Sequence, residues 1–220
     1  RNRLIALASV IALENNEGAT VVTDSLTSDG LREFIEKELH SKQLRFKRGY
    51  KNVIDKSIEL NNNGVLSTLA IETSGHAALK ENYFLDDGAY LATKIVILVA
   101  KLKAQGKTID DLIGKLKEPK ENLEIRAKIN VENFKEYGEN VLNELIKLAE
   151  SRSDWKIEKE NYEGVRINIS GGWFLLRLSV HDPILPLNIE SDNAGDCDRI
   201  AKEMKEFLSK FDMLDLSNFK

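Results

Sequence analysis

The segment 71–76 places a carboxylate (Glu72), a hydroxyl (Ser74) and an imidazole (His76) directly after an apolar run. Glu72 and Ser74 are two residues apart, so in an extended segment their side chains point to the same side. A carboxylate accepts and a hydroxyl donates hydrogen bonds, which suits recognition of adjacent sugar hydroxyls. A polar turn at a strand end, with Gly75 supplying the bend, explains the same residues without a ligand. Both interpretations stay open on this segment alone.

A basic run over residues 42–51 is the second candidate. Half of its ten residues are basic and none is acidic: Lys42, Arg45, Lys47, Arg48 and Lys51. Gly49 lies where a strand gives way to a helix, and a glycine turn with cations at a helix N-terminus suits phosphate. A strand edge protected by charge is the alternative. An RNA-binding patch is a third interpretation, disfavoured because no aromatic series alternates with the charges beyond Phe46 and Tyr50.

The third candidate is the segment 177–183, which joins two apolar runs. Arg177 can fork onto phosphate oxygens, and Ser179 can donate its hydroxyl. His181 and Pro183 follow in the same loop. Ordinary hairpin chemistry is the alternative, and it is the interpretation that the sequence alone favours.

Composition restricts the class of protein. The chain of 220 residues has 42% apolar and 31% charged residues, which is typical of a globular protein with one large domain or two small ones. Its 36 acidic and 32 basic residues give a net charge of −4, which argues against nucleic acid as the main partner. The single cysteine, Cys197, closes no intrachain disulfide and fits a reducing cytosol, so we expect a cytoplasmic protein. The sequence shows no Cys/His metal cluster, P-loop or Gly-x-Ser-x-Gly elbow.

The N-terminal residues imitate a secretory signal, because Arg1 and Arg3 precede an apolar stretch that ends at Leu13. No small-x-small cleavage site follows, and the stretch has about half of the ~20 residues that a membrane span needs. We therefore expect a buried helix here and no membrane partner.

Residues 1–118 alternate helical and strand-like patterns, which predicts an α/β domain with a mixed sheet. The expected helices cover about 2–15, 28–39, 51–61, 87–105 and 108–116, and the expected strands 19–23, 43–47 and 68–73. A charged stretch with Pro119 ends this part of the chain, so a domain boundary is expected there.

Residues 119–220 predict a smaller α+β domain, an antiparallel sheet with two helices on one face. Apolar residues alternate with charged ones from Leu123 to Ile129, as in a half-buried strand. Further strands are expected at 155–158, 165–169, 173–179 and 184–190, with helices from Phe134 to Leu148 and from Ile200 to Phe211.

Taken in order, these segments resemble the motifs of the α-D-phosphohexomutase family, which includes phosphoglucomutase and phosphomannomutase. Segment 72–76 looks like the family's sugar-binding Glu-x-Ser-Gly-His loop, and segment 49–51 looks like its Gly-aromatic-Lys segment. Arg177 and Ser179 before Pro183 resemble the phosphate-binding loop of the last domain. Further matches lie at Thr27-Ser28, Lys80-Glu81-Asn82 and Asp86-Asp87-Gly88. The resemblance covers nearly the whole chain.

The resemblance implies the third and fourth domains of a four-domain enzyme, with sugar binding in 1–118 and phosphate binding in 119–220. Such an enzyme interconverts hexose 1-phosphate and hexose 6-phosphate through a phosphoserine and a bisphosphate intermediate. The phosphoserine loop and the Asp-rich magnesium loop belong to the first two domains and have no counterpart in this sequence. The implied cofactors, Mg²⁺ and a hexose 1,6-bisphosphate activator, therefore belong to the parent enzyme, and the implied partners are a hexose phosphate and the missing N-terminal domains.

The resemblance also assigns roles to residues. It implies hydroxyl recognition by Glu72 and Ser74, and phosphate binding by Arg177, Ser179 and His181. His76, Gly49, Lys51 and Arg48 complete the implied substrate-binding set, with no catalytic or metal-binding residue in this chain. Ile71 stands where many members have Gly, and Val180 and His181 depart from the commoner loop. The chain alone is expected to be inactive; a stand-alone, non-catalytic sugar-phosphate-binding module is the alternative.

Overall fold

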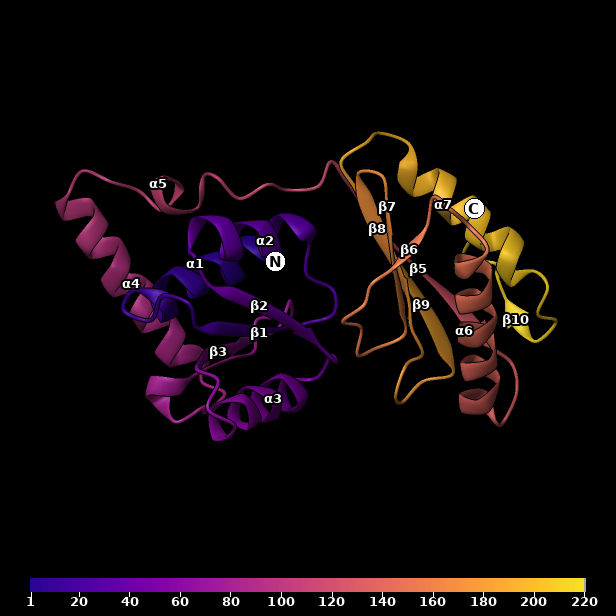
Figure 1. Cartoon of the computed structure of the whole chain (residues 1–220), viewed down its shortest axis with the longest axis horizontal. Coiled ribbons are helices and arrows are strands. Elements are labelled where there is room, and N and C mark those ends of the chain that lie inside the picture. The colour runs from indigo at the N-terminus through magenta and orange to yellow at the C-terminus, as the bar shows by residue number, and fades with distance from the viewer. Residues whose placement is uncertain (220) are drawn as a thin grey trace. The chain divides into compact units, whose positions relative to one another are not determined.

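The computed structural model describes residues 1–219 and divides the chain into two compact units (Figure 1). The first unit is Arg1–Glu118, and the second begins at Pro119. Among residues 1–219, no helix combines the length and apolar character that crossing a membrane requires.

The first unit is built on a four-stranded sheet in the order β2-β1-β3-β4. Its strands are β1 (Thr20–Asp24), β2 (Lys42–Phe46), β3 (Ser67–Ile71) and β4 (Ala77–Leu79). Strands β1, β2 and β3 are parallel, whereas β4 is antiparallel to β3, so the expected mixed sheet is confirmed. Every residue of β1 and β3 is buried, as in a parallel sheet covered on both faces.

Helices cover both faces of this sheet. The helices are α1 (Asn2–Leu13), α2 (Asp29–Glu33), η1 (Phe34–Glu38), α3 (Tyr50–Asn62), η2 (Lys80–Asn82), α4 (Gly88–Ala104) and α5 (Asp110–Ile113). Val21 packs with α1, α2 and η1 in one core cluster, whereas its neighbour Val22 packs with Val53 of α3 in another. Successive strand residues point to opposite faces, so α3 lies on the face opposite to α1 and α2.

Two helices differ from the sequence expectation. The helix expected over 28–39 is an α-helix followed by a π-helix, and the one expected over 108–116 is helical only from Asp110 to Ile113. Gly114 caps the shorter helix, and glycine has a low helix preference.

The second unit is a six-stranded sheet in the order β10-β5-β9-β8-β7-β6, antiparallel throughout. Its elements are β5 (Glu121–Ile129), α6 (Phe134–Glu150), β6 (Lys156–Ile157), β7 (Val165–Ile169), β8 (Gly172–Leu176), β9 (Ile184–Ser191), α7 (Asp196–Leu208) and β10 (Leu214–Asp215). Both helices share one apolar cluster with the sheet and lie on the same side of it (Figure 1), which confirms the predicted α+β fold.

The other face of this sheet carries charged side chains. Ile125, Ala127 and Ile129 of β5 enter the core, so the alternating Arg126 points to the opposite face. On that face the Arg166 guanidinium lies 3.6 Å from the centre of the Trp173 ring, and both residues are buried. The segment that follows β8 therefore starts beside buried cationic and aromatic groups.

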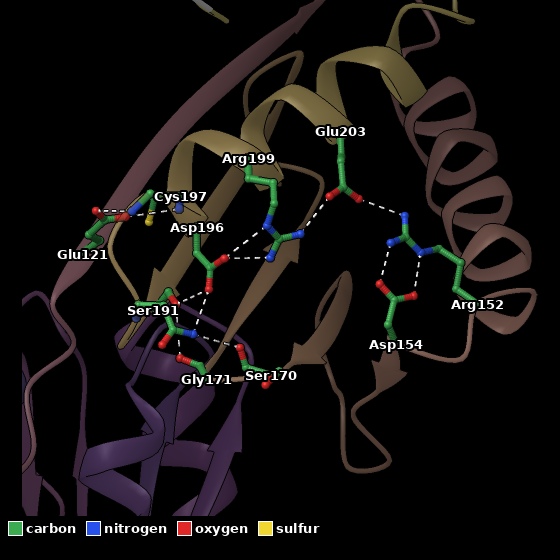
Figure 2. Close-up of polar contacts among 12 residues, drawn as sticks. Glu121, Arg152, Asp154, Ser170, Gly171, Ser191, Asp196, Cys197, Arg199 and Glu203 are labelled. Carbon is green, nitrogen blue, oxygen red and sulfur yellow. Dashed lines mark hydrogen bonds and ion pairs between the residues drawn. The ribbon is translucent and has the colours of Figure 1, made fainter.

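A polar network fixes α7 within the second unit (Figure 2). The Glu121 carboxylate accepts hydrogen bonds from the backbone N–H groups of Gly195 and Cys197, at 2.7 and 3.2 Å, where α7 begins. Along the helix, Glu203 joins Arg199 to Arg152, each at 2.8 Å. These bonds satisfy two N–H groups at the start of α7 and tie the helix to the end of α6.

Candidate functional site

The loops of the first candidate site follow three neighbouring parallel strands. In the register of the sheet, Asp24 lies opposite Phe46 and Thr23 lies opposite Ile71, so β1, β2 and β3 end at the same edge. The connections after β1 and β2 lead to helices on opposite faces. Ligands of open α/β sheets bind outside the carboxyl ends of the strands, where the connections diverge in this way.

Glu72 joins two of these loops. Its side chain is only 5% exposed, and its Oε1 accepts a hydrogen bond from the Gly49 backbone N–H at 2.6 Å. Its Oε2 accepts a bond from the Ser74 hydroxyl at 3.3 Å. The segment is a turn, closed by the Gly75 N–H on the Glu72 carbonyl at 3.0 Å, and not the extended segment assumed from the sequence. Gly49 has a φ of +110°, and a Cβ there would lie 2.9 Å from the Asn52 amide nitrogen. Glycine is required at this turn because an L side chain strains it.

His76 is held in one orientation at the rim of the site. Its Nδ1 lies 2.7 Å from the Asp86 carboxylate, and its ring stacks on Tyr50 with the centroids 5.3 Å apart. Since a carboxylate accepts, Nδ1 donates to Asp86 and directs Nε2 away from it. The side chain of His76 is about half exposed, at 53%, so Nε2 remains accessible to a ligand.

Asp24 is a site residue that the sequence analysis did not identify. It is fully buried, and its Oδ2 accepts bonds from the Thr73 backbone N–H at 3.1 Å and the Thr73 hydroxyl at 2.6 Å. Burial raises the pKa of Asp24, while the two Thr73 bonds and the nearby Arg48 oppose that rise. The Arg48 Nε lies 4.0 Å from Oδ2. An acid directly after a predicted buried strand was the available signal.

The basic run does not form one surface. Arg45 is buried and binds the Ser28 carbonyl at 2.9 Å and Asp29 at 2.6 Å, so it fixes the start of α2. Arg48 is partly exposed beside Asp24, and Lys51 is exposed in the first turn of α3. Arg48 and Lys51 are therefore at least partly exposed, whereas Arg45 serves the fold.

The second candidate site lies in the other unit, where the chain leaves β8. The side chain of Arg177 is buried, with its Nη1 3.6 Å from Oε1 of Glu163. The hydroxyl of Ser179 accepts a bond from the Asp182 backbone N–H at 3.3 Å, and His181 is exposed at the loop tip. The structure thus places Ser179 and His181 in the exposed loop and directs Arg177 inward.

Glu163 was also missed by the sequence analysis. It precedes Gly164, which has a φ of +60° and whose missing Cβ would lie 2.3 Å from the Leu176 carbonyl oxygen. The Asn161 amide donates to the Gly164 carbonyl at 2.5 Å. The segment before β7 therefore packs directly against the end of β8, where Arg177 begins the loop.

Within the described part of the chain, no group of three or more His, Cys, Asp or Glu side chains is arranged to hold a metal ion.

A mixed sheet with polar loops at the carboxyl edge of its parallel strands, followed by an antiparallel α+β unit, is consistent with two domains of the phosphohexomutase fold. A crystal structure of a phosphoglucomutase/phosphomannomutase family protein from Burkholderia thailandensis has this fold, with a TM-score of 0.73 and 22% identity over 95% of this chain and 41% of that one. Residues 1–119 match the family described as phosphoglucomutase/phosphomannomutase, alpha/beta/alpha domain III. The chain belongs to the phosphoglucomutase/phosphomannomutase family, as its motifs indicate.

Curated relatives agree with this assignment. The phosphomannomutase/phosphoglucomutase of Pseudomonas syringae pv. tomato is 29% identical over 202 residues, which are 90% of this chain and 40% of the relative. The phosphoglucomutase of Neisseria gonorrhoeae is 28% identical over 205 residues, which are 93% of this chain and 41% of the relative. The chain therefore spans about 40% of the length of these relatives.

Proposed function

We propose that this chain supplies the sugar-hydroxyl and phosphate recognition of a phosphohexomutase that interconverts hexose 1-phosphate and hexose 6-phosphate. The observation that carries the proposal is the buried carboxylate of Glu72, which joins Gly49 and Ser74 at the carboxyl edge of the domain III sheet. The names of the relatives, phosphoglucomutase and phosphomannomutase, support the class of reaction.

Glu72 has the acceptor capacity that a sugar needs. An ionised carboxylate offers about four acceptor positions. Gly49 and Ser74 each use one of them, and these two bonds hold the carboxylate in a fixed orientation. A sugar hydroxyl can donate to Glu72 while a neighbouring hydroxyl bonds Ser74 or Nε2 of His76. Because the protein fixes the carboxylate beforehand, the ligand does not have to order it.

Cations supply the phosphate recognition in this proposal. Arg48 and Lys51 lie at the turn that Glu72 holds, and Arg177 begins the loop with Ser179 and His181 in the second unit. The phosphoserine that exchanges phosphate with the sugar through a bisphosphate, and the magnesium ion, are assigned to parts of the parent enzyme outside this chain. We place that enzyme in the cytoplasm, since Cys197 is buried and needs no oxidising compartment.

The proposal is tested by titrating the ¹⁵N-labelled chain with glucose 1-phosphate and following the amide resonances. We expect weak binding, with the largest shifts in residues 49–51 and 72–76. Glu72→Gln removes a charged acceptor and should weaken binding about tenfold. Glu17→Gln, an exposed change of the same charge in the same unit, should leave binding unchanged. Shifts that avoid both loops, or equal binding by the two variants, would contradict the proposed sugar site.

A further inference from the structure

Arg177 has a resident counter-ion in the ligand-free chain. Its Nη1 lies 3.6 Å from the Glu163 carboxylate, and the two side chains are only 10% and 12% exposed. A buried guanidinium without a nearby negative charge is strongly unfavourable, so Glu163 stabilises Arg177 in its inward position. The group that is proposed to bind phosphate is thus already paired with an anion.

The backbone before β7 fixes the position of this anion. Gly164 adopts a positive φ and approaches the Leu176 carbonyl so closely that no side chain fits between them. The Asn161 amide bonds the Gly164 carbonyl and closes the turn. Glu163 is therefore held beside Arg177 by the fold of the turn, whereas Glu160 in the same segment is exposed.

We propose that Glu163 is a specificity-determining residue. An incoming phosphate must either displace the Glu163 carboxylate from Arg177 or share the guanidinium with it. This inference rests on the proposed phosphate-binding role of the 177–183 loop. Exchanging one monoanion for another gains no charge–charge attraction, whereas a phosphate dianion brings twice the charge and can form a forked pair with the guanidinium. Glu163 thereby selects phosphate monoesters and rejects singly charged carboxylates.

Neutralising Glu163 leaves Arg177 with a second acidic neighbour. The pKa of Glu124 is lowered, although burial opposes this, by hydrogen bonds from Arg126 and Asn188 and by the charges of Arg126 and Arg177. The field of Glu124 therefore reaches Arg177. We expect Glu163→Gln to fold, since Gln has the same shape and Arg177 keeps this partial compensation.

The test measures binding of inorganic phosphate and of acetate to the 220-residue chain by NMR titration. It is run well above the second ionisation of inorganic phosphate, which lies higher than the pKa of about 6 of a phosphate monoester, so that phosphate is the dianion. Glu163→Gln should bind phosphate about tenfold more tightly than the unchanged chain. Acetate binding, negligible in the unchanged chain, should become measurable in this variant. Glu160→Gln changes the net charge equally and should leave both affinities within about twofold.

The outcomes separate this inference from the proposed function. If Glu163→Gln binds both anions like the unchanged chain, while Arg177→Gln loses phosphate, the selectivity role of Glu163 is wrong and the phosphate loop stands. Weaker phosphate binding by Glu163→Gln would mean that the carboxylate orients Arg177, which also overturns the inference. If no form of the chain binds phosphate, the phosphate role of Arg177 is wrong and the inference with it. Should Glu163→Gln unfold, Glu163→Asp provides the second test. The shorter Asp side chain places its carboxylate farther from Arg177, so phosphate should bind more tightly than to the unchanged chain, by less than the roughly tenfold gain expected for Glu163→Gln.

Discussion

At the scale of single residues, Glu72 combines a proposed binding role with a structural role, and a single substitution of Glu72 affects both. It is the proposed acceptor for a sugar hydroxyl, and it is also the acceptor for the Gly49 backbone N–H. Replacing it by alanine removes both of these bonds and the acceptor of the Ser74 hydroxyl, whereas replacing Ser74 by alanine removes one neutral donor. We therefore expect Glu72 to contribute more to the free energy of binding than Ser74 does.

We expect Glu72→Ala in the full-length parent enzyme to lower kcat/KM by about 10- to 100-fold, since bonds to a charged acceptor contribute about 1.5 to 3 kcal/mol. Ser74→Ala should cost about half of that free energy. Both variants should remain folded, as thermal unfolding checks. A Glu72→Ala enzyme with unchanged kcat/KM would make the loop a turn without a binding role.

Asp24 predicts a pH dependence of stability. Burial raises its pKa above the ordinary 3.8, so the folded chain binds a proton more tightly than the unfolded chain does. The contribution of Asp24 to stability is therefore most favourable below the ordinary pKa and decreases as pH rises toward the raised value. Compared with Asp24→Asn, the unchanged chain should lose stability over this window, as measured by urea unfolding from about pH 4 upward. A stability difference that does not vary with pH would exclude this role.

Cys197 should react slowly with thiol reagents. It is 5% exposed, and burial together with the charge of Glu121 raises its pKa to about 11. Two pKa units above the ordinary 9.0 reduce the thiolate fraction about a hundredfold. We expect slow modification by a chromogenic disulfide in the folded chain and fast modification in denaturant. Equally fast modification in both states would contradict the buried position.

At the scale of the elements, the sequence predicts the helices and strands that are long enough to show a periodic pattern of apolar residues. The buried runs of β1 and β3, the alternation of β5 and the amphipathic α7 appear as expected. Strands β4 and β10 contain three and two residues, which is too few to show an alternation. Their pairing depends on neighbours that the local pattern does not reveal.

The contacts in the candidate sites depend mostly on the tertiary fold, as do the short strands. Glu72 and Ser74 do lie close together, but in a turn closed by the Gly75 N–H on the Glu72 carbonyl at 3.0 Å, not in the extended segment that the spacing argument assumed. Asp24 bonds a residue 49 positions later, and Glu163 pairs with Arg177 across the end of a neighbouring strand. Contacts of this kind are created by the tertiary fold and leave no local signal.

The turn before β7 should tolerate no side chain at Gly164. A Cβ there would lie 2.3 Å from the Leu176 carbonyl oxygen, and the φ of +60° adds strain. Gly195 in the same unit has a φ of +84° with open space around it, so Gly195→Ala isolates the cost of the positive φ alone. We expect Gly195→Ala to cost about 1 kcal/mol and Gly164→Ala about 3 kcal/mol or more, measured by urea unfolding. Equal costs would show that the two strands separate easily.

At the scale of the whole molecule, the chain spans about 40% of its curated relatives, and the proposed recognition loops lie in both of its units. In the proposed mechanism the group that donates and receives phosphate lies outside the chain. A bound sugar phosphate would be positioned but would have no reaction partner.

We therefore expect the 220-residue chain to form no glucose 6-phosphate from glucose 1-phosphate, with magnesium and with or without glucose 1,6-bisphosphate. A coupled dehydrogenase assay detects the product, and a full-length relative provides the positive control. Turnover by a chain of verified mass would show that a phosphoryl carrier exists within these residues, and the assignment of roles would be wrong.

The protected position of Cys197 also makes this chain a convenient subject for spectroscopy. Because the one native thiol is buried and protonated, a cysteine introduced at the exposed position of Glu160 would be the only one to react quickly with a dye or spin label. The native cysteine need not be removed, so the packing of α7 stays as it is. A probe at that position would report on the surroundings of the turn that carries Glu163, with and without phosphate in solution.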